Sequence, residues 1–331
     1  MTLRLVFGAE DLRRIRFAED VDLMWELVLG LQMAQGASGD LPFMAWRQQL
    51  TRRIAVDRAS WDAVASLRSL VAASGDFPDF LTPLQGASHI DRACELLSGV
   101  SPAHLRADVV AAFNRRAPSP QARSLACGDR RSFRDLVKAT RIAHHLLVEP
   151  AWRHIEERVA AERTRRLRLW STQGVDAMLR SLPGVLSWDD RVLRTRYPVT
   201  RTVRLNGRGI ILIPAFFCWG NPITWIDPAL PPVLVYQAHQ RADPIDGHVD
   251  VPVGLVALLG RTRAESLRAL LESRSTSELA QHLGTSVGTA SKQTTVLRNA
   301  GLITSTRVAG SVLHRTTALG NSLLISTLPR S

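Results

Sequence analysis

The chain has 331 residues, and its 45% hydrophobic and 22% charged content is typical of a globular protein and excludes a disordered one. Its net charge of +12 favours an anionic partner, either nucleic acid or an anionic membrane surface. Almost all of this charge is arginine, since only Lys138 and Lys292 are lysines. Because a GC-rich genome produces the same bias, the arginine content alone is weak support for phosphate binding.

The cysteines and the apolar runs indicate the cellular compartment of the protein. Cys94, Cys127 and Cys218 are far apart and none belongs to a C-x-x-C pair, which argues against a disulfide framework and fits a reducing cytosol. The N-terminus shows no charged-then-apolar leader. The longest apolar run, IILIPAFFCW, contains a proline and is about half as long as a membrane span. We therefore expect a cytoplasmic protein without a membrane partner.

The region 1–184 is predicted to be mainly helical. Its first residues, LRLVFG, alternate as a strand does. The segment DVDLMWELVLGLQMAQG then has leucines at helical spacing, and later helices begin at the caps Asp57 and Ser101. A long charged helix at 151–173 closes near Gly174. Its arginines are interleaved with glutamates, which favours a solvated face or a dimer contact over a nucleic-acid site.

Between residues 185 and 238 the apolar period changes to two, which predicts a small antiparallel sheet packed on the helices. The segment VLRTRYPVTRTVRLNGRGIILIP is typical of strands around a turn at Asn206-Gly207, a pair that tolerates positive φ. PITWIDP and PPVLVYQ are predicted as two further short strands. The expected fold class is therefore α+β.

This sheet region is rich in aromatic side chains, among them Phe216, Phe217, Trp219 and Trp225. An exposed patch of that size is unusual, so it must be covered by the protein's own helices, by a partner subunit or by an apolar effector. The protein's own helices, particularly Trp25–Leu31, are the favoured cover. We hypothesise that the sheet and the helix 151–173 form a regulatory body, in which these four residues make effector or dimer contacts.

Residues 239–253 form a polar, proline-punctuated linker. It contains His239, Asp243, Asp246, His248 and Asp250. On a strand the last three would face one way and could bind a divalent cation, but the proline and glycine among them favour a solvated linker. The sequence also lacks G-x-G-x-x-G, P-loop, G-x-S-x-G and H-E-x-x-H signatures. We expect no enzyme activity, no cofactor and no metal.

The segment 254–331 has the order helix, helix, helix, hairpin, which predicts a winged helix-turn-helix domain. Capping boxes at Thr262 and Ser275 begin the first two helices, and Ser286 caps the third. The hairpin, or wing, spans 303–316. This segment holds nine Lys or Arg against three Glu, a net charge of +6.

The predicted recognition helix, 286–299, carries no acidic residue. Ala290, Thr294 and Leu297 are spaced so that they face inward, which leaves small, hydroxyl and amide side chains outside. A carboxylate on a helix in the major groove would meet phosphate charge, so its absence favours DNA binding over a merely solvated helix. The predicted DNA-binding residues are Ser286, Gly288, Thr289, Ser291, Lys292, Gln293, Thr295, Arg298, Arg307 and Arg315.

The stretch STSELAQHLGTSVGTASKQTTVLRNAGLI resembles the winged helix-turn-helix of ArsR-type bacterial repressors, with their E-L-A helix, glycine turn, Ser/Thr-rich recognition helix and LR-x-AGL ending. The resemblance covers about residues 255–325. The preceding region more loosely resembles long regulators of high-GC bacteria in the pieces DFLTP, GRGIILIP and IDPALPPVLVY. Thr294 stands where the family has Leu. The E-L-A helix lacks the cysteine pair of metal-sensing members and has only His282, so metal sensing is not expected.

The resemblance implies a homodimer on an inverted-repeat operator in double-stranded DNA, usually a repressor released by a small-molecule effector. We therefore expect a cytoplasmic, nucleoid-associated transcriptional regulator. Two alternatives remain from the sequence. One is an enzyme or small-molecule-binding protein that uses the winged helix only for dimerisation, and the other is an architectural DNA-binding protein without an effector.

Overall fold

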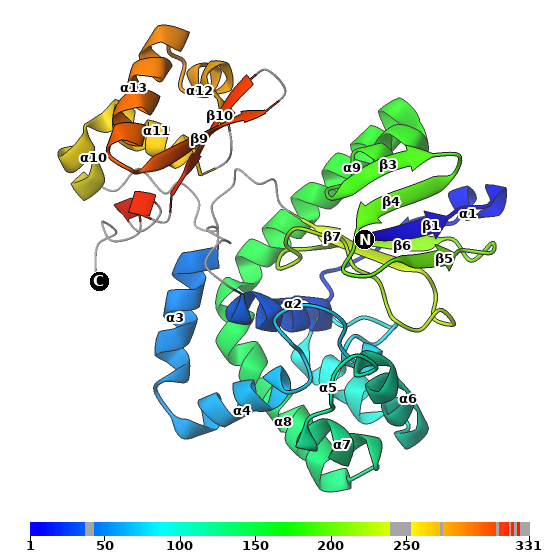
Figure 1. Ribbon diagram of the computed structural model, residues 1–331. Helices are drawn as coiled ribbons and strands as arrows, with labels where there is room; N and C mark the ends of the chain where they lie inside the picture. Colours follow the sequence, from blue (N-terminus) through cyan, green and yellow to red (C-terminus); the bar gives the residue numbers. More distant parts are fainter. Residues whose placement is uncertain are drawn as a thin grey trace. The chain divides into compact units, whose positions relative to one another are not determined.

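The computed structural model divides into two compact units, Met1–Gln240 and Arg241–Ser331 (Figure 1). Both combine helices with strands, which confirms a mixed α+β fold. The structure describes residues 1–36, 43–238, 253–271, 274–308, 311–317, 319–320 and 323–324. The predicted linker lies almost wholly outside these ranges, and so do its candidate metal ligands His239, Asp243, Asp246, His248 and Asp250.

The first unit contains both long and short helices. Its α-helices are α1 (Ala9–Arg13), α2 (Leu23–Gln35), α3 (Met44–Ile54), α4 (Arg58–Arg68), α5 (Ile90–Ser98), α6 (Pro102–Ala112), α7 (Pro120–Ala126), α8 (Arg130–Leu147) and α9 (Trp152–Arg180). Short 3-10 helices occur at Asp79–Leu81 and Glu149–Ala151. The predicted caps Asp57 and Ser101 are confirmed, since each side chain accepts a backbone N–H of the first turn. Gly174 interrupts α9 with φ 84°, and the helix continues beyond it.

The strands of the first unit form two sheets, one four-stranded and one three-stranded. The strands are β1 (Thr2–Val6), β2 (Ile15–Phe17), β3 (Val185–Asp189), β4 (Val192–Arg196), β5 (Arg201–Arg204), β6 (Ile210–Ala215) and β7 (Val233–Gln237). The four-stranded sheet has the order β3-β4-β1-β5, with β1 antiparallel to β4 and parallel to β5. The three-stranded sheet, β2-β6-β7, is entirely parallel. The predicted antiparallel sheet is therefore confirmed only in part: β4 pairs antiparallel with β3 and with β1, but the four-stranded sheet is mixed and the other sheet is parallel.

The physical reason is that strands from the N-terminus pair with strands from the 185–238 region. Asn206 and Gly207 do form a turn, with φ of 52° and 77°, but the turn leads from one sheet to the other and does not close a hairpin. The predicted strand PITWIDP is reduced to a single bridge at Ile223, because the backbone N–H groups of Ile226 and Asp227 donate to the Asp79 carboxylate.

Helix α2 fills the centre of the first unit. Every residue from Leu23 to Leu31 is buried. Figure 1 shows the strands gathered at one end of this unit and α4–α8 at the other, with α2 between them. The sheets are covered by the C-terminal half of α9, where Met178 and Leu179 pack against Leu5 and Leu193 in one apolar cluster.

Helix α2 also carries a buried acid. Glu26 is 1% exposed, and its two carboxyl oxygens accept the backbone N–H groups of Phe216 at 2.7 Å and Phe217 at 3.0 Å. Burial raises the pKa of Glu26 to about 8 despite these two bonds. Asp22, the N-cap of α2, also has a pKa raised by burial, to about 7. The helix is thereby joined to the end of β6 through hydrogen bonds as well as through apolar packing.

Replacing Glu26 by Gln is expected to change how the stability of this unit depends on pH. The pKa of the carboxyl is higher in the folded state, about 8 against an ordinary 4.5, so its stabilisation is lost as pH rises through that window. From about pH 5 to pH 8 the wild type should lose on the order of 3 kcal/mol more than Glu26→Gln, since the protonation difference spans about 2.5 pKa units of about 1.36 kcal/mol each.

Tryptophan fluorescence during urea unfolding measures this loss for the first unit alone, because all 8 tryptophans lie in it. At the lower pH the variant should be the less stable protein, since its amide can satisfy only one of the two N–H donors. Equal losses in both proteins would show that Glu26 does not titrate in this range.

The second unit contains a three-stranded antiparallel sheet in addition to its helices. Its elements are α10 (Val253–Leu259), α11 (Arg261–Ala269), β8 (Arg274–Ser275), α12 (Thr276–His282), α13 (Val287–Asn299), β9 (Ile303–Val308) and β10 (Ser311–Thr316). The sheet order is β8-β10-β9. The predicted capping box at Ser275 is confirmed. The one at Thr262 is wrong, because α11 begins after Gly260 (φ 78°) and takes Thr262 into its first turn.

No helix in the described parts of either unit combines the length and the apolar character needed to cross a membrane.

Candidate nucleic-acid interface

Helices α12 and α13 are joined by a tight turn. Gly284 adopts φ 62° at its centre, a conformation that favours glycine, and the Thr285 N–H donates to the Ala280 carbonyl at 2.9 Å. Helix α13 then begins at Ser286, whose hydroxyl oxygen accepts the Thr289 N–H at 3.1 Å. The predicted N-cap is thus confirmed, and it fixes where the helix starts.

The inward face of α13 is the predicted one. Ala290, Thr294 and Leu297 are buried in the apolar cluster of the second unit or beside it. Thr294 is 4% exposed, and its hydroxyl donates to the Ser291 carbonyl at 3.0 Å. The hydroxyl at this core position is therefore satisfied within its own helix, as is common for threonine in helices.

The outward face of α13 presents small residues and one cation. Gly288, Ser291, Lys292 and Thr295 are all exposed. Among the described residues Lys292 has no ion pair or hydrogen bond. The Thr295 hydroxyl donates back to the Ser291 carbonyl at 2.9 Å, so its remaining capacity is that of an acceptor.

Two of the predicted DNA-binding residues are partly engaged by other residues. Gln293 is half-buried, and its side-chain oxygen accepts from Arg263 of α11 at 3.3 Å. Thr289 is half-buried, with its hydroxyl 2.9 Å from that of Ser286. Each can therefore hydrogen-bond to a ligand only through the donor and acceptor atoms that these contacts do not use.

The hairpin β9–β10 is tied to α12 through a buried histidine. His314 is 4% exposed; its Nε2 lies 3.0 Å from the Thr276 hydroxyl and its Nδ1 2.8 Å from that of Ser305. Burial, and then the Arg298 charge, lower the pKa of His314, so the ring is neutral at physiological pH. The hairpin is consequently held to the helices by polar contacts that carry no charge.

The remaining predicted residues lie on or near the hairpin. Arg298, near the end of α13, and Arg315, on β10, are both exposed. Arg307 lies in β9, but its side chain is outside the described part of the chain. One residue of this surface was missed in the sequence. Val287, at the start of α13, is 52% exposed, and its position directly after the cap was the available signal.

Carboxylates are scarce in this unit. Among its described residues the acids are Glu265 and Glu278. Glu278 is engaged in the capping box with the Ser275 N–H at 2.7 Å, and Glu265 lies 4.0 Å from Arg261. Between Thr285 and Thr306 the chain has no acid, so the field over α13 and the hairpin is positive.

In the first unit, the four predicted effector or dimer residues separate into two groups. Phe216 and Phe217 are buried and pack with Phe43 (ring centroids 5.7 and 5.5 Å apart), and Gly30 of α2 meets the Phe217 ring. Trp225 is buried too, and its indole N–H donates to the Thr82 hydroxyl at 3.0 Å. Their cover is the helical layer, as favoured from the sequence. Trp219 alone of the four is half-buried.

A small cavity of about 160 Å³ lies beside Trp219. Its apolar walls include Met33 of α2, Phe77 and Ile223. Its polar wall includes Tyr197, whose hydroxyl donates to the Thr224 carbonyl at 3.5 Å and the pKa of which burial raises to about 12.

Asp76 also lines the cavity, and Arg201 contacts both Asp76 and Tyr197. Arg201 donates to the Tyr197 hydroxyl at 3.3 Å and to the Trp225 carbonyl at 3.2 Å, and it lies 3.4 Å from Asp76. This ion pair links β5 to the loop before Asp79. No local sequence pattern predicts this pair, because its members come from distant segments.

Comparison of the chain with protein-family models, with curated proteins and with solved structures yields no match. No group of three or more metal-ligating side chains occurs among the described residues.

Replacing Ser286 by Ala should destabilise the start of α13 by about 1 kcal/mol, because the Thr289 N–H loses its acceptor. Ser286→Asn should keep most of that stability, since asparagine caps equally well. Hydrogen exchange of the α13 amides, followed by mass spectrometry, measures the free energy of this local opening. Equal protection in the Ala and Asn variants would contradict the role of the cap.

Proposed function

We propose that the protein is a homodimeric, sequence-specific DNA-binding regulator that acts as a repressor. In this proposal the second unit is a winged helix-turn-helix, α13 is its recognition helix and the β9–β10 hairpin is its wing. The observation that carries the proposal is the outward face of α13, which is exposed, contains Lys292 and has no carboxylate. The protein would be cytoplasmic and nucleoid-associated.

Each part of that face suits a role on duplex DNA. The Val287 and Gly288 N–H groups at the helix start, with the Ser286 hydroxyl, suit a phosphate. Lys292 is long enough to reach a base edge in the major groove, and the exposed Val287 side chain suits the methyl group of thymine. Arg315 on the hairpin suits the sugar–phosphate backbone.

A homodimer on an inverted repeat follows from the size of one such module. A single recognition helix reads only a few base pairs, and a second copy related by two-fold symmetry doubles the site. Leu258 of α10, which is exposed in the single chain, offers an apolar contact for that second copy. Repression would end when an effector bound in the first unit.

The experiment selects bound sequences from a pool of random duplexes with the full-length protein. Binding of the selected site is then compared for wild type, Lys292→Ala, Arg315→Ala and the control Lys138→Ala, which removes the chain's other lysine from the exposed face of α8. Each variant of the second unit should weaken binding about 10-fold, as expected for one lost charged contact, and the control should not. The salt slope should fall by about one unit where a phosphate contact is lost.

Failure to enrich any sequence would reject sequence-specific recognition and leave the architectural role or the dimerisation role of this module. Enrichment with unchanged binding by both Lys292→Ala and Arg315→Ala would place recognition elsewhere on the protein.

The cavity beside Trp219 is the proposed effector site. Its size suits a molecule of about the size of a single aromatic ring, with a polar group that faces Tyr197. A compound found by thermal shift to stabilise the full-length protein should weaken operator binding. Trp219→Ala should abolish both effects, whereas Trp61→Ala, at an exposed position of α4, should abolish neither. Retention of both effects by Trp219→Ala would exclude this cavity.

A further inference from the structure

The four-stranded sheet of the first unit turns a row of arginines outward. Along β1, Leu3 and Leu5 are buried while Arg4 between them is exposed. Because strand side chains alternate between faces, the same alternation on β4 and β5 places further arginines on that outer face. We call it the arginine face, defined by Arg4, Arg194, Arg196 and Arg204.

The strand register brings these positive charges close together. Arg4 is the direct partner of Arg194 on β4, and Arg204 on β5 is the direct partner of Val6. Neighbouring strands lie about 4.8 Å apart, and like charges placed directly opposite are destabilising. Arg194 is offset in part by Asp189 at 3.6 Å. Among the described residues, Arg4, Arg196 and Arg204 have no ion pair.

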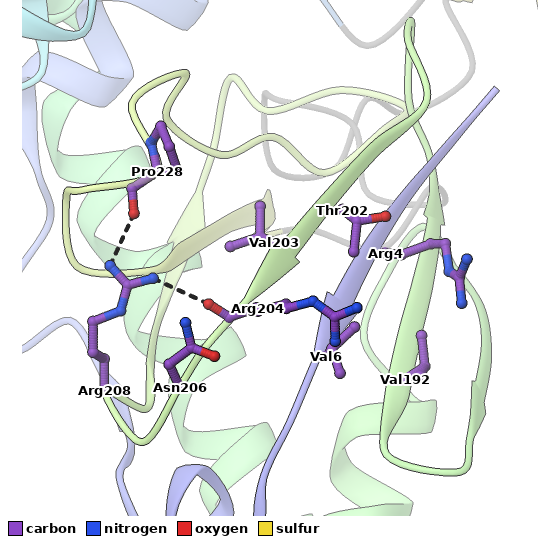
Figure 2. A pocket seen from close by; sticks show the side chains of 9 residues that line it. All are labelled: Arg4, Val6, Val192, Thr202, Val203, Arg204, Asn206, Arg208 and Pro228. Carbon is purple, nitrogen blue, oxygen red and sulfur yellow. Dashed lines mark hydrogen bonds between the residues drawn. The ribbon is translucent and has the colours of Figure 1, made fainter.

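Beside this row the surface is hollowed, as Figure 2 shows. The hollow has a volume of about 560 Å³ and is lined by Arg4 and Arg204 together with Thr202, Asn206 and Arg208. Val6, Val192, Val203 and Pro228 complete the lining, and none of the described lining residues is aromatic or acidic. Its donors are thus guanidinium, hydroxyl and amide groups, the side chains that proteins present to phosphate oxygens.

Arg208 forms the wall of the hollow. Its guanidinium donates to the backbone carbonyls of Arg204 at 3.1 Å, Pro228 at 2.9 Å and Leu230 at 3.0 Å, two of which are drawn in Figure 2. Carbonyl oxygens satisfy its N–H groups without neutralising it. Arg208 therefore braces the loop that follows Asp227 and leaves its full positive charge at the edge of the hollow.

We propose that the arginine face is a second nucleic-acid-binding surface, which binds the phosphate backbone of duplex DNA without reading its sequence. The site is open and polar, whereas pockets for small molecules are mostly apolar and enclosing. Without aromatic side chains it offers no platform for unpaired bases. A membrane surface would require exposed aromatic or leucine anchors, and the lining of the hollow has none.

The inference is independent of the role proposed for α13, and both can be tested in the full-length chain. The sheet variant carries Arg4→Gln, Arg196→Gln and Arg204→Gln. Its matched control carries Arg52→Gln, Arg68→Gln and Arg134→Gln, which remove the same charge from exposed positions on three helices of the same unit. The tryptophan unfolding midpoint verifies that each variant remains folded.

Binding to a mixed-sequence duplex of about 24 base pairs is measured by anisotropy between about 50 and 250 mM salt. The sheet variant should lower the slope of log K against log salt by about 2 to 3 units, since each lost phosphate contact removes about 0.9. Its affinity at the lowest salt should fall at least about 10-fold. If the triple variant unfolds, Arg204→Gln alone should lower the slope by about one unit.

Three results would overturn the proposal. The first is an unchanged slope in the sheet variant, and the second is an equal loss in the control, which would be an effect of net charge alone. The third is a sheet variant that no longer binds phosphatidylserine vesicles but binds the duplex as wild type does, which would identify a membrane surface. When the three sheet substitutions are added to a protein that already carries Lys292→Ala and Arg315→Ala, they should still lower the slope. If the protein with Lys292→Ala and Arg315→Ala alone binds like wild type, the role proposed for α13 is refuted and the proposal for the arginine face is unaffected.

Discussion

Two buried carboxyl groups hold the strand region of the first unit to its helices. Glu26 accepts the N–H groups of Phe216 and Phe217, and Asp79 accepts those of Ile226 and Asp227. A neighbouring strand would normally satisfy such donors, and each one left buried and unpaired would cost about 1–3 kcal/mol. The acids allow the chain to leave β6 without a further strand pairing, and this places Trp219 beside a cavity.

The same arrangement determines where the charge lies. Helix α9 and the apolar strand residues fill the inner side of the four-stranded sheet, so an arginine on its strands is accommodated outside or, like Arg201, through a specific ion pair. The alternation that buries Leu3 and Leu5 is therefore also what exposes Arg4. Core formation and the positive surface are two consequences of one period-two pattern.

The features that the sequence predicted are those with local causes. The caps at Ser275 and Ser286 and the inward face of α13 depend on residues within one or two helical turns. The parallel strand pairing was missed because β1 pairs with β5 from about two hundred positions away, and nothing near Asn206-Gly207 distinguishes a turn between sheets from a hairpin. The arginine face was missed for the same reason, since its charges come together only through register.

If both proposals hold, the chain has two binding surfaces, one of which contributes affinity and the other specificity. Contacts to phosphate carry no sequence information but supply much of the binding free energy, whereas contacts to bases contribute discrimination. Lys292 is the one cation among the exposed residues Gly288, Ser291, Lys292 and Thr295 of α13, and a single phosphate contact contributes little to affinity at physiological salt. In these proposals the unpaired arginines of the first unit would supply phosphate contacts that the central face of α13 lacks. Its short side chains can then be selected for fit to bases and not for charge.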